Sequence, residues 1–490
     1  MGVRQQIERF FKGPEEFDLT SGSIGKPLFY LSLPIVITNL FQTAYNLADT
    51  FWLGQYNTDA LAAISFAFPM VFLLISLGMG VSVAGSVLVA QFTGAGEERE
   101  AEYAASQTIT FAVIISILLG AIGYVFVSDF LSVMGASADV LPLATSYMEV
   151  ISLGLLFMFG FAVFIALMRG YGDTITPMLV MFGSVVLNIV LDPFLIFGWT
   201  VVENAPLVGT LAFPELGIQG AAIATVFSRA LALVVGLAIM FRGHRGVQIN
   251  IRDMAPDFDY LRRLVRIGGP ASIEGSGRAI SMNLLLFIVA FFPDAVVAAY
   301  GVGTRVFSVI FLPAIAISRG VETMTGQNIG AGQPDRAAAA ANLASKVLFV
   351  VLALAGLVVF AFPEPIISAF VGADQANADQ VVSVGAEFLR YVALTFGFIG
   401  VTQAYVGSFR GAGKTLTAAV ISVVVLGFVR FPIAWIASGP LGETGIWVAF
   451  AVSNVLGGVL AYLWYQRGTW RDADLTEDRV DAEDVVATDD

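Results

Sequence analysis

The chain carries a series of long apolar stretches, separated by short polar segments, between Phe29 and Tyr465. A helix of about 20 apolar residues spans the roughly 30 Å hydrocarbon core of a lipid bilayer. We therefore expect an all-α polytopic membrane protein with twelve transmembrane helices. The predicted spans are 27–53, 60–92, 103–128, 141–167, 175–198, 217–241, 262–292, 295–325, 337–362, 381–408, 414–437 and 445–466.

The second half of this pattern repeats the first. The motif Gln91–Gly96 recurs as Gln327–Gly332, and Arg169–Thr174 recurs as Arg410–Thr415, each after roughly 240 residues. Matching motifs follow corresponding spans, so both halves cross the membrane in the same direction. The sequence predicts two parallel six-helix repeats with a central cleft. We expect a cytoplasmic segment at 1–26, a first lobe at 27–241, a linker at 242–261, a second lobe at 262–466 and an acidic disordered tail at 467–490.

The distribution of charge among the loops predicts the orientation. The segments that join spans 1 and 2, 3 and 4, and each later odd-even pair contain no Lys or Arg. Basic residues such as Arg242, Arg262 and Arg410 gather on the other side. By the positive-inside rule, we expect a multi-pass protein of the plasma membrane with both termini in the cytoplasm.

Composition excludes several kinds of chemistry. The chain has no cysteine and a single histidine, His244, so we expect no disulfide, thiolate metal site or haem. The segment Gly411–Thr415 resembles the end of a phosphate-binding loop, but Ser408 stands where that motif requires glycine. We therefore expect no nucleotide site, no nucleic-acid partner and no cofactor other than a transported ion.

Polar residues inside the predicted spans form two stripes. In span 1 they recur at spacings of three and four from Asn39 to Thr50 and include Asp49; in span 5, Asn188 and Asp192 share one face. At 1.5 Å per residue, Asp49 and Asp192 lie at a similar depth, and Thr225 of span 6 lies at about the same level. Two acids at one depth predict a site for a proton or Na⁺. The alternative is a structural pair that packs helices together.

The second half does not repeat these acids. Asp49 corresponds to a position near Leu285, and Asp192 to one near Phe431. Glu274 and Arg278 are four residues apart and predict an ion pair within span 7. Pro34 in span 1 predicts a kink whose shape changes when Asp49 is protonated; a static bend is the alternative.

Several motifs together resemble the multidrug and toxic compound extrusion (MATE) family. They are Asn46–Gly54, Asp59–Ala63, Arg169–Thr174 and Asn188–Pro193, and the similarity extends to about Gln466. The match looks closest to the archaeal and DinF-like branches. The resemblance implies a twelve-helix exporter that exchanges Na⁺ or H⁺ for organic compounds, often cationic and aromatic.

The resemblance also implies roles for individual residues. In those branches the first lobe binds the coupling ion. The positions that match this cation site are Asp49, Asn188, Asp192, Thr225 and Tyr147, and the resemblance implies that a Na⁺ ion would be bound by the first four. The matching substrate cleft includes Gln42, Tyr45 and Asn46.

Our hypothesis from the sequence is a cation-coupled multidrug exporter that works by alternating access. Its partners would be small organic molecules and the bilayer, with no obligate protein partner. One alternative is a flippase for lipid-linked oligosaccharide or peptidoglycan precursors, which needs cations such as Arg278, Arg305 and Arg430 in its cavity. A membrane-embedded enzyme is the second alternative, although the chain lacks the nucleophiles and metal ligands that most such sites use.

Overall fold

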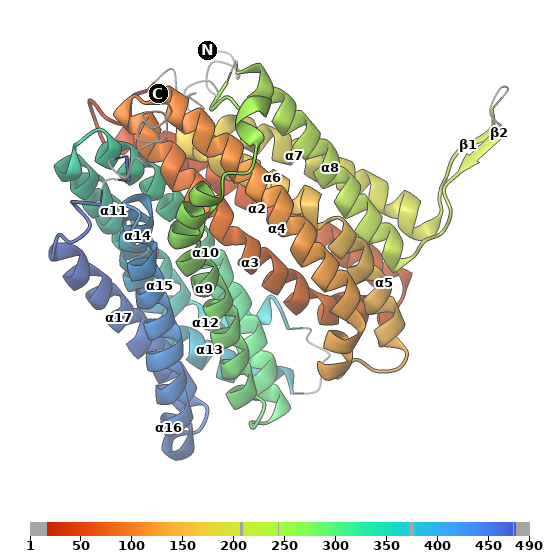
Figure 1. Cartoon of the computed structure of the whole chain (residues 1–490). Coiled ribbons are helices and arrows are strands. Elements are labelled where there is room, and N and C mark those ends of the chain that lie inside the picture. Colours follow the sequence, from red (N-terminus) through yellow and green to blue (C-terminus); the bar gives the residue numbers. More distant parts are fainter. Residues whose placement is uncertain (1–16, 206–208, 244, 372–376, 474, 477–490) are drawn as a thin grey trace, which may run out of the picture. The chain divides into compact units, whose positions relative to one another are not determined.

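The structure is a computed structural model that describes residues 17–205, 209–243, 245–371, 377–473 and 475–476 (Figure 1). Within these residues, nine helices are long and apolar enough to cross a membrane, and two bent helix pairs raise the number to eleven. The remaining predicted span is helix α9 (Phe258–Val289), whose charged residues reduce its hydropathy. The described chain is thus built from the helices that the apolar pattern predicts.

The first half of the chain contains helices that follow one another through short turns. They are α2 (Gly25–Tyr56), α3 (Thr58–Ala95), α4 (Glu98–Val133), α5 (Val140–Leu153), α6 (Leu155–Tyr171), α7 (Ile175–Phe197) and α8 (Ile218–Arg242). The second half begins with a short 3₁₀ turn, η2 (Ile251–Met254), and then α9. It continues with α10 (Asp294–Gly330), α11 (Pro334–Ala361), α12 (Pro363–Ser368), α13 (Ala378–Ala393), α14 (Phe396–Gly411), α15 (Thr415–Val423), the π-helical segment η3 (Val424–Arg430), α16 (Phe431–Leu441) and α17 (Thr444–Gln466).

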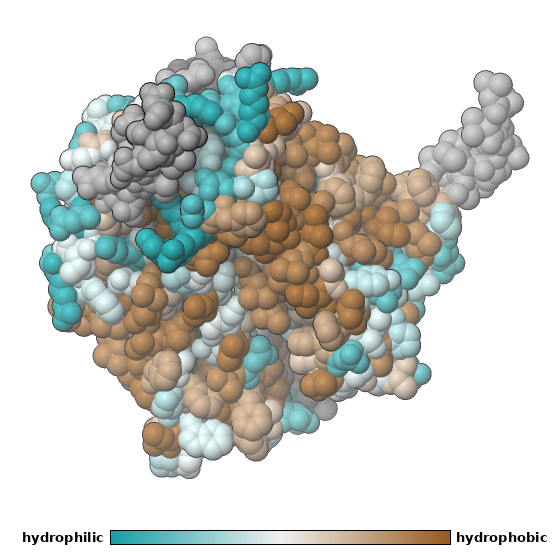
Figure 2. All heavy atoms as spheres, viewed as in Figure 1, coloured by the Kyte–Doolittle hydropathy of each residue, from teal (hydrophilic) through white to brown (hydrophobic). Residues whose placement is uncertain are grey.

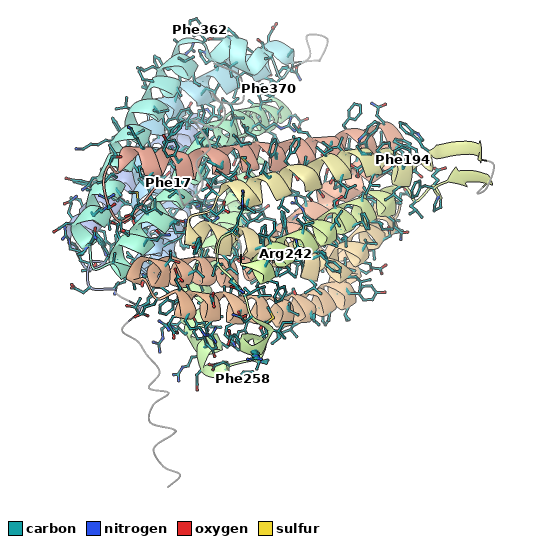
Figure 3. The ribbon with its side chains drawn as sticks, turned by 90° about the horizontal axis from the view of Figure 1, so that it is seen from above. Phe17, Phe194, Arg242, Phe258, Phe362 and Phe370 are labelled. Atoms are coloured by element: carbon teal, nitrogen blue, oxygen red, sulfur yellow. The ribbon has the colours of Figure 1, made fainter. Side chains whose placement is uncertain are left out.

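A small β-hairpin interrupts the helical pattern between α7 and α8. Strands β1 (Thr200–Ala205) and β2 (Gly209–Ala212) pair antiparallel, with Thr200 opposite Ala212. At its base, the ring of Phe194 lies 5.9 Å from that of Trp199 and 6.0 Å from that of Phe213 (Figure 3). Our sequence analysis expected only a loop here. The segment is not apolar enough to span a membrane, and its β-branched residues favour extended backbone.

Two predicted spans are bent pairs of helices rather than single helices. The α5–α6 pair is bent by 54° and the α13–α14 pair by 52°. Gly154 stands at the first bend, where a Cβ atom would lie 2.2 Å from a methyl group of Val226. Helix α8 therefore packs into a space that only glycine leaves open. The second bend, at Leu394 and Thr395, occupies the corresponding position of the repeat. The internal repeat thus extends to these helix breaks.

The turns of the repeat also match in detail. Gly96 and Gly332 have positive φ angles of 74° and 67°, and each ends a helix as a left-handed cap. Gly94 and Gly330 approach the opposite motif closely: a Cβ atom on either would lie 1.9 Å from a backbone carbonyl oxygen of the other motif. The two motifs thus contact each other reciprocally within one compact part of the described chain.

The described chain divides into two compact units that do not follow chain order strictly. The first contains residues 33–89 and 99–272; the second contains 17–32, 90–98 and the residues from Ile273 onward. Packing thus assigns the start of α2 and the end of α3 to the second unit. Of the predicted terminal segments, residues 1–16 and 477–490 lie outside the described residues, as does His244.

Large apolar side chains cover the outward faces of the helices (Figure 2). Among them Val125 is 68% exposed, Phe428 is 74% exposed and Ile436 is 72% exposed. Contiguous apolar surface of this extent is unfavourable in water and is normal for a protein whose solvent is lipid. The surface therefore agrees with the apolar length of the helices in indicating a membrane protein.

The linker between α8 and α9 is fastened to α4 by polar contacts. The guanidinium of Arg99 donates two hydrogen bonds to the Asp253 carboxylate, at 2.5 and 2.6 Å. The Gln107 amide donates to the backbone carbonyls of Asp253 and Ala255, each at 2.7 Å. Arg99 also holds the pKa of Asp253 below its usual value, chiefly through these hydrogen bonds. The linker is therefore an ordered part of the first unit.

Replacing Asp253 by Asn is expected to lower the free energy of unfolding by about 1 kcal/mol at neutral pH, the upper end for a surface ion pair. Because the folded pKa is depressed, the carboxylate contributes fully above its unfolded pKa of about 3.9, and this contribution is lost as the pH falls through the folded value. Thermal unfolding of both proteins in detergent should therefore differ at pH 7 and converge as the pH falls below the folded pKa of Asp253. The exposed Asp259, replaced by Asn, is the control. A difference that persists unchanged in acid would contradict this assignment.

Candidate ion-binding site

Helices α2 and α7 bring three polar side chains together inside the first unit. Asp49 is 5% exposed, and Asn188 and Asp192 are fully buried. Asn188 and Asp192 are one helical turn apart, and the Asn188 amide donates to the Asp192 carboxyl at 3.2 Å. Asp49 lies within hydrogen-bonding reach of both. The polar residues predicted on two separate spans therefore lie together in one buried cluster.

Three oxygen atoms in this cluster receive no hydrogen bond from the described residues. They are Oδ1 of Asp49, Oδ1 of Asn188 and Oδ2 of Asp192, and all three are buried. Buried polar atoms are almost always satisfied, because an unpaired one costs about 1–3 kcal/mol. A proton or a small cation between the carboxyl groups would supply the missing partner.

Two tyrosines and a threonine complete the wall of the cluster. Tyr45 on α2 donates from its hydroxyl to that of Thr225 on α8, at 2.5 Å. Tyr147 on α5 is 6% exposed and lies within electrostatic range of both Asp49 and Asp192. The structure thus places Thr225 and Tyr147 beside the two acids. It also places Tyr45, which we expected in the substrate cleft, within the same buried cluster.

Arg229 on α8 is a further member of the site, which the two polar stripes of the sequence did not predict. Its guanidinium lies 4.9 Å from the ring centroid of Tyr45, and it donates to the Gln42 carbonyl at 2.8 Å. Gln42 in turn donates to Asn46 at 3.1 Å, on the exposed side of α2. The signal that could have found Arg229 is its position one helical turn after Thr225, on the same face.

The charges of the cluster do not balance. Asp49 and Asp192 carry two negative charges when ionised, and Arg229 supplies one positive charge. One monovalent cation or one proton would make the group neutral, which a low-dielectric interior favours. The atoms that could bind a cation here are carboxylate, amide and hydroxyl oxygens. These are hard ligands of the kind that alkali and alkaline-earth cations prefer. The residues present therefore fit Na⁺ as well as H⁺.

Pro34 lies inside α2, which runs without a break from Gly25 to Tyr56. The Thr38 hydroxyl donates to the Pro34 carbonyl at 2.9 Å. Back-bonding of this kind often bends a helix, and the missing N–H of Pro34 acts in the same direction. The predicted role of Pro34 as a gating kink stays a prediction.

The second unit contains a buried ion-pair network instead of paired acids. Glu274 is 2% exposed and accepts hydrogen bonds from Arg410 at 2.5 and 3.1 Å and from Ser422 at 3.0 Å. The predicted Glu274–Arg278 pair is present, with a longer N–O distance of 3.5 Å. The closer partner, Arg410, lies on α14, so a pattern within span 7 could not reveal it.

A second buried cation lies farther along the same unit. Arg430, at the end of η3, is 6% exposed and donates at 2.8 Å to both Ser453 and Asn454. Its guanidinium lies 4.3 Å from the ring centroid of Phe450. Among the described residues no carboxylate forms an ion pair with it. A positive charge thus stands close to the repeat position that Asp192 occupies in the first half.

Comparisons with known proteins agree on one relationship. A family model described as MatE matches residues 34–194 and 270–436. A curated relative named "FAD transporter", from Shewanella oneidensis, is 30% identical over 92% of this chain and 96% of its own length. Another, "Probable multidrug resistance protein NorM" from Thermotoga maritima, is 27% identical over 93% of this chain and 96% of its own length.

Solved structures show the same fold. One, described as "Outward-facing conformation of a multidrug resistance MATE family transporter of the MOP superfamily", has a TM-score of 0.83 and 23% identity, covering 93% of this chain and 98% of that chain. A second, a MOP superfamily transporter from Pyrococcus furiosus, has a TM-score of 0.84 and 23% identity, with the same coverage of both chains.

Proposed function

Because the chain belongs to the MatE family of membrane transporters, we propose that it is a secondary active exporter that exchanges Na⁺ or H⁺ for organic compounds by alternating access. The family consists of transporters, so the chain is a multi-pass membrane transporter and not an enzyme. The observation that carries the coupling proposal is the buried pair of acids, in which Oδ1 of Asp49 and Oδ2 of Asp192 lack a hydrogen-bond donor among the described residues.

In this proposal Asp49 and Asp192 bind one cation, with Asn188 and Thr225 as further oxygen ligands. An ion can drive a conformational change only by binding one state more tightly than the other. The net charge of the cluster supports a conformational change that depends on the bound ion, because the ion-bound form is neutral and the ion-free form is not. The orientation with cytoplasmic termini in the plasma membrane belongs to the same proposal, since the loop charges predict it.

Organic cations with aromatic rings are the substrates we propose first. Curated relatives named as multidrug exporters support this class; MepA of Staphylococcus aureus, for example, is 24% identical over 96% of this chain. For the substrate face we propose Gln42 and Asn46. They share a hydrogen bond on the exposed side of α2.

Transport in reconstituted vesicles tests both the function and the coupling ion. We expect an aromatic cation such as ethidium to leave the vesicle interior against its gradient when a Na⁺ gradient or a pH gradient is imposed, each applied alone with the membrane potential clamped. Protein-free vesicles are the control. Equal movement with and without both gradients would refute the proposed exchange.

A second candidate substrate class is an anionic flavin nucleotide. Two observations favour it: the 30% identical relative named "FAD transporter", and the buried Arg430, which forms no ion pair among the described residues. Arg and Lys side chains are the usual partners of phosphate groups. The same vesicles, loaded with FAD instead of ethidium, separate the candidates, because FAD export without ethidium export would assign the anionic substrate.

A further inference from the structure

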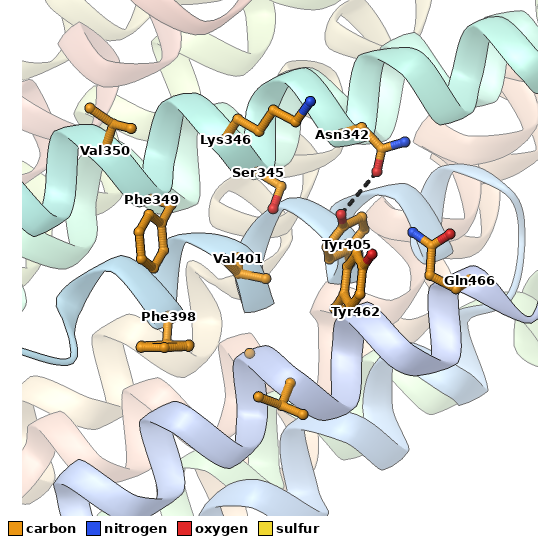
Figure 4. A pocket seen from close by; sticks show the side chains of 12 residues that line it. Asn342, Ser345, Lys346, Phe349, Val350, Phe398, Val401, Tyr405, Tyr462 and Gln466 are labelled. Atoms are coloured by element: carbon orange, nitrogen blue, oxygen red, sulfur yellow. Dashed lines mark hydrogen bonds between the residues drawn. The ribbon is translucent and has the colours of Figure 1, made fainter.

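A groove between α11, α14 and α17 of the second unit has no role in the proposed exchange. It encloses about 560 Å³ and lies wholly within that unit (Figure 4). Its lining changes in character along its length. Asn342, Lys346 and Gln466 lie toward one end, and Phe349, Val350 and Phe398 lie toward the other.

Glycine forms part of the floor of the groove, where α17 packs closely against α14. Gly458 on α17 lines it, and a Cβ atom there would lie 3.0 Å from the Phe398 side chain. Any larger residue would therefore fill the space or displace the aromatic ring. The rims are apolar and open, since Val350 is 55% exposed and Val459 is 41% exposed. Among lipid chains, these rims would be in contact with hydrocarbon.

The polar end of the groove carries an unpaired positive charge. Lys346 is exposed, and it forms no ion pair with any described residue. Figure 4 shows its ammonium extending toward the end that holds Asn342 and Gln466. Nearby, the Tyr405 hydroxyl donates to the Asn342 carbonyl at 2.9 Å, which leaves the amide NH₂ of Asn342 available as a donor. The end is thus rich in donors and has one formal charge.

This polar end is close to the end of a helix long and apolar enough to cross a membrane. Gln466 is the last residue of α17 and Arg467 follows it, so the end of the span is close. A lysine stem can run along apolar surface while its ammonium reaches the interface. Tyr462, 46% exposed, adds an aromatic ring of the kind that gathers at membrane interfaces.

We propose that this groove binds an anionic phospholipid, with Lys346 and the amides of Asn342 and Gln466 holding the phosphate and an acyl chain lying against Phe349 and Phe398. A free phosphate ion would bind only at the polar end and would leave the apolar part of the groove without a contact. A zwitterionic lipid would leave the lysine charge only partly balanced. The combination of one cation, several donors and an apolar channel therefore favours a lipid with net negative charge.

Native mass spectrometry of the full chain in detergent tests this proposal. Phosphatidylglycerol and phosphatidylcholine with identical acyl chains are titrated in parallel, and we expect the first to bind more tightly. Replacing Lys346 by Gln should reduce this preference about fivefold, the effect of one lysine near a membrane surface. Replacing it by Arg should keep the preference. Lys414, in the turn between α14 and α15, is the control when replaced by Gln.

The apolar part of the groove has its own test. Replacing Val459 by Trp should fill the channel and weaken the binding of both lipids. The control is Leu354→Trp, at a position on α11 that is 58% exposed and outside the groove, which should leave the binding of both lipids unchanged. Thermal unfolding checks that each variant is folded. Equal affinity of the two lipids for the unaltered protein, an unchanged preference in Lys346→Gln, or displacement of bound lipid by millimolar inorganic phosphate would overturn the proposal.

Discussion

Replacement of Asp49 by Asn is expected to reduce ion-driven export to the level of protein-free vesicles while leaving the protein folded. The variant keeps the shape of the side chain and removes one negative charge. Asp192 and Arg229 would then balance each other, so the cluster would be neutral without any cation. A site that is already neutral has little reason to take up Na⁺ or H⁺ from one side of the membrane.

Two measurements make this expectation sharp. Efflux of ethidium under imposed ion gradients should be lost in Asp49→Asn and retained in Asp139→Asn, which neutralises an exposed acid of the same unit. Thermal unfolding as a function of Na⁺ concentration, and in parallel of pH, should show stabilisation of the unaltered protein by the coupling ion that is absent from the Asp49 variant. Undiminished export by Asp49→Asn would rule out the coupling role of this acid, even if the family assignment stands.

Replacement of Arg410 by Gln is expected to destabilise the protein by roughly 3–5 kcal/mol, because it leaves the buried Glu274 carboxylate without its closest partner. The pair is shielded on both sides: the side chains of Arg410 and Glu274 are 7% and 2% exposed. Thermal unfolding in detergent should show a fall of several degrees in the midpoint. The double variant Glu274→Gln/Arg410→Gln should recover part of the loss, because it removes both charges.

An exposed pair in the same unit provides the matched control for Arg410. Arg390 and Glu364 also form an ion pair, but their side chains are 49% and 48% exposed. Arg390→Gln should therefore cost no more than about 1 kcal/mol. Equal losses for Arg410→Gln and Arg390→Gln would show that burial does not govern the contribution of the network.

Prediction from the sequence succeeded where the relevant information is local. The predicted spans correspond to helices because hydrocarbon requires every backbone group to be bonded within its own segment, and apolar length marks those segments. The repeat was equally visible, and the structure extends it to the paired bends at Gly154 and at Leu394 and Thr395. The common depth of Asp49 and Asp192 followed from the helical rise alone.

Prediction failed or stopped short where contacts join distant segments. Nothing in span 7 indicated that Glu274 would bond to Arg410 more closely than to Arg278, because the pairing depends on how α9 and α14 pack. The hairpin between α7 and α8 was missed, since its strands are short and stabilised by each other. The groove beside Lys346 has no sequence signature, because three helices form it.

The sequence by itself determined that this is a membrane protein, that its halves are repeats and that the second half has no counterparts of Asp49 and Asp192, because apolar length, motif spacing and charge are properties of the chain. Only the tertiary structure decided that Arg229 and Tyr45 join the two acids, and that three buried oxygens there receive no hydrogen bond from the part of the chain that the structure describes. The physical reason is rotation: each helix turns about its own axis until its small and polar faces fit its neighbours, and that fit depends on all the helices at once.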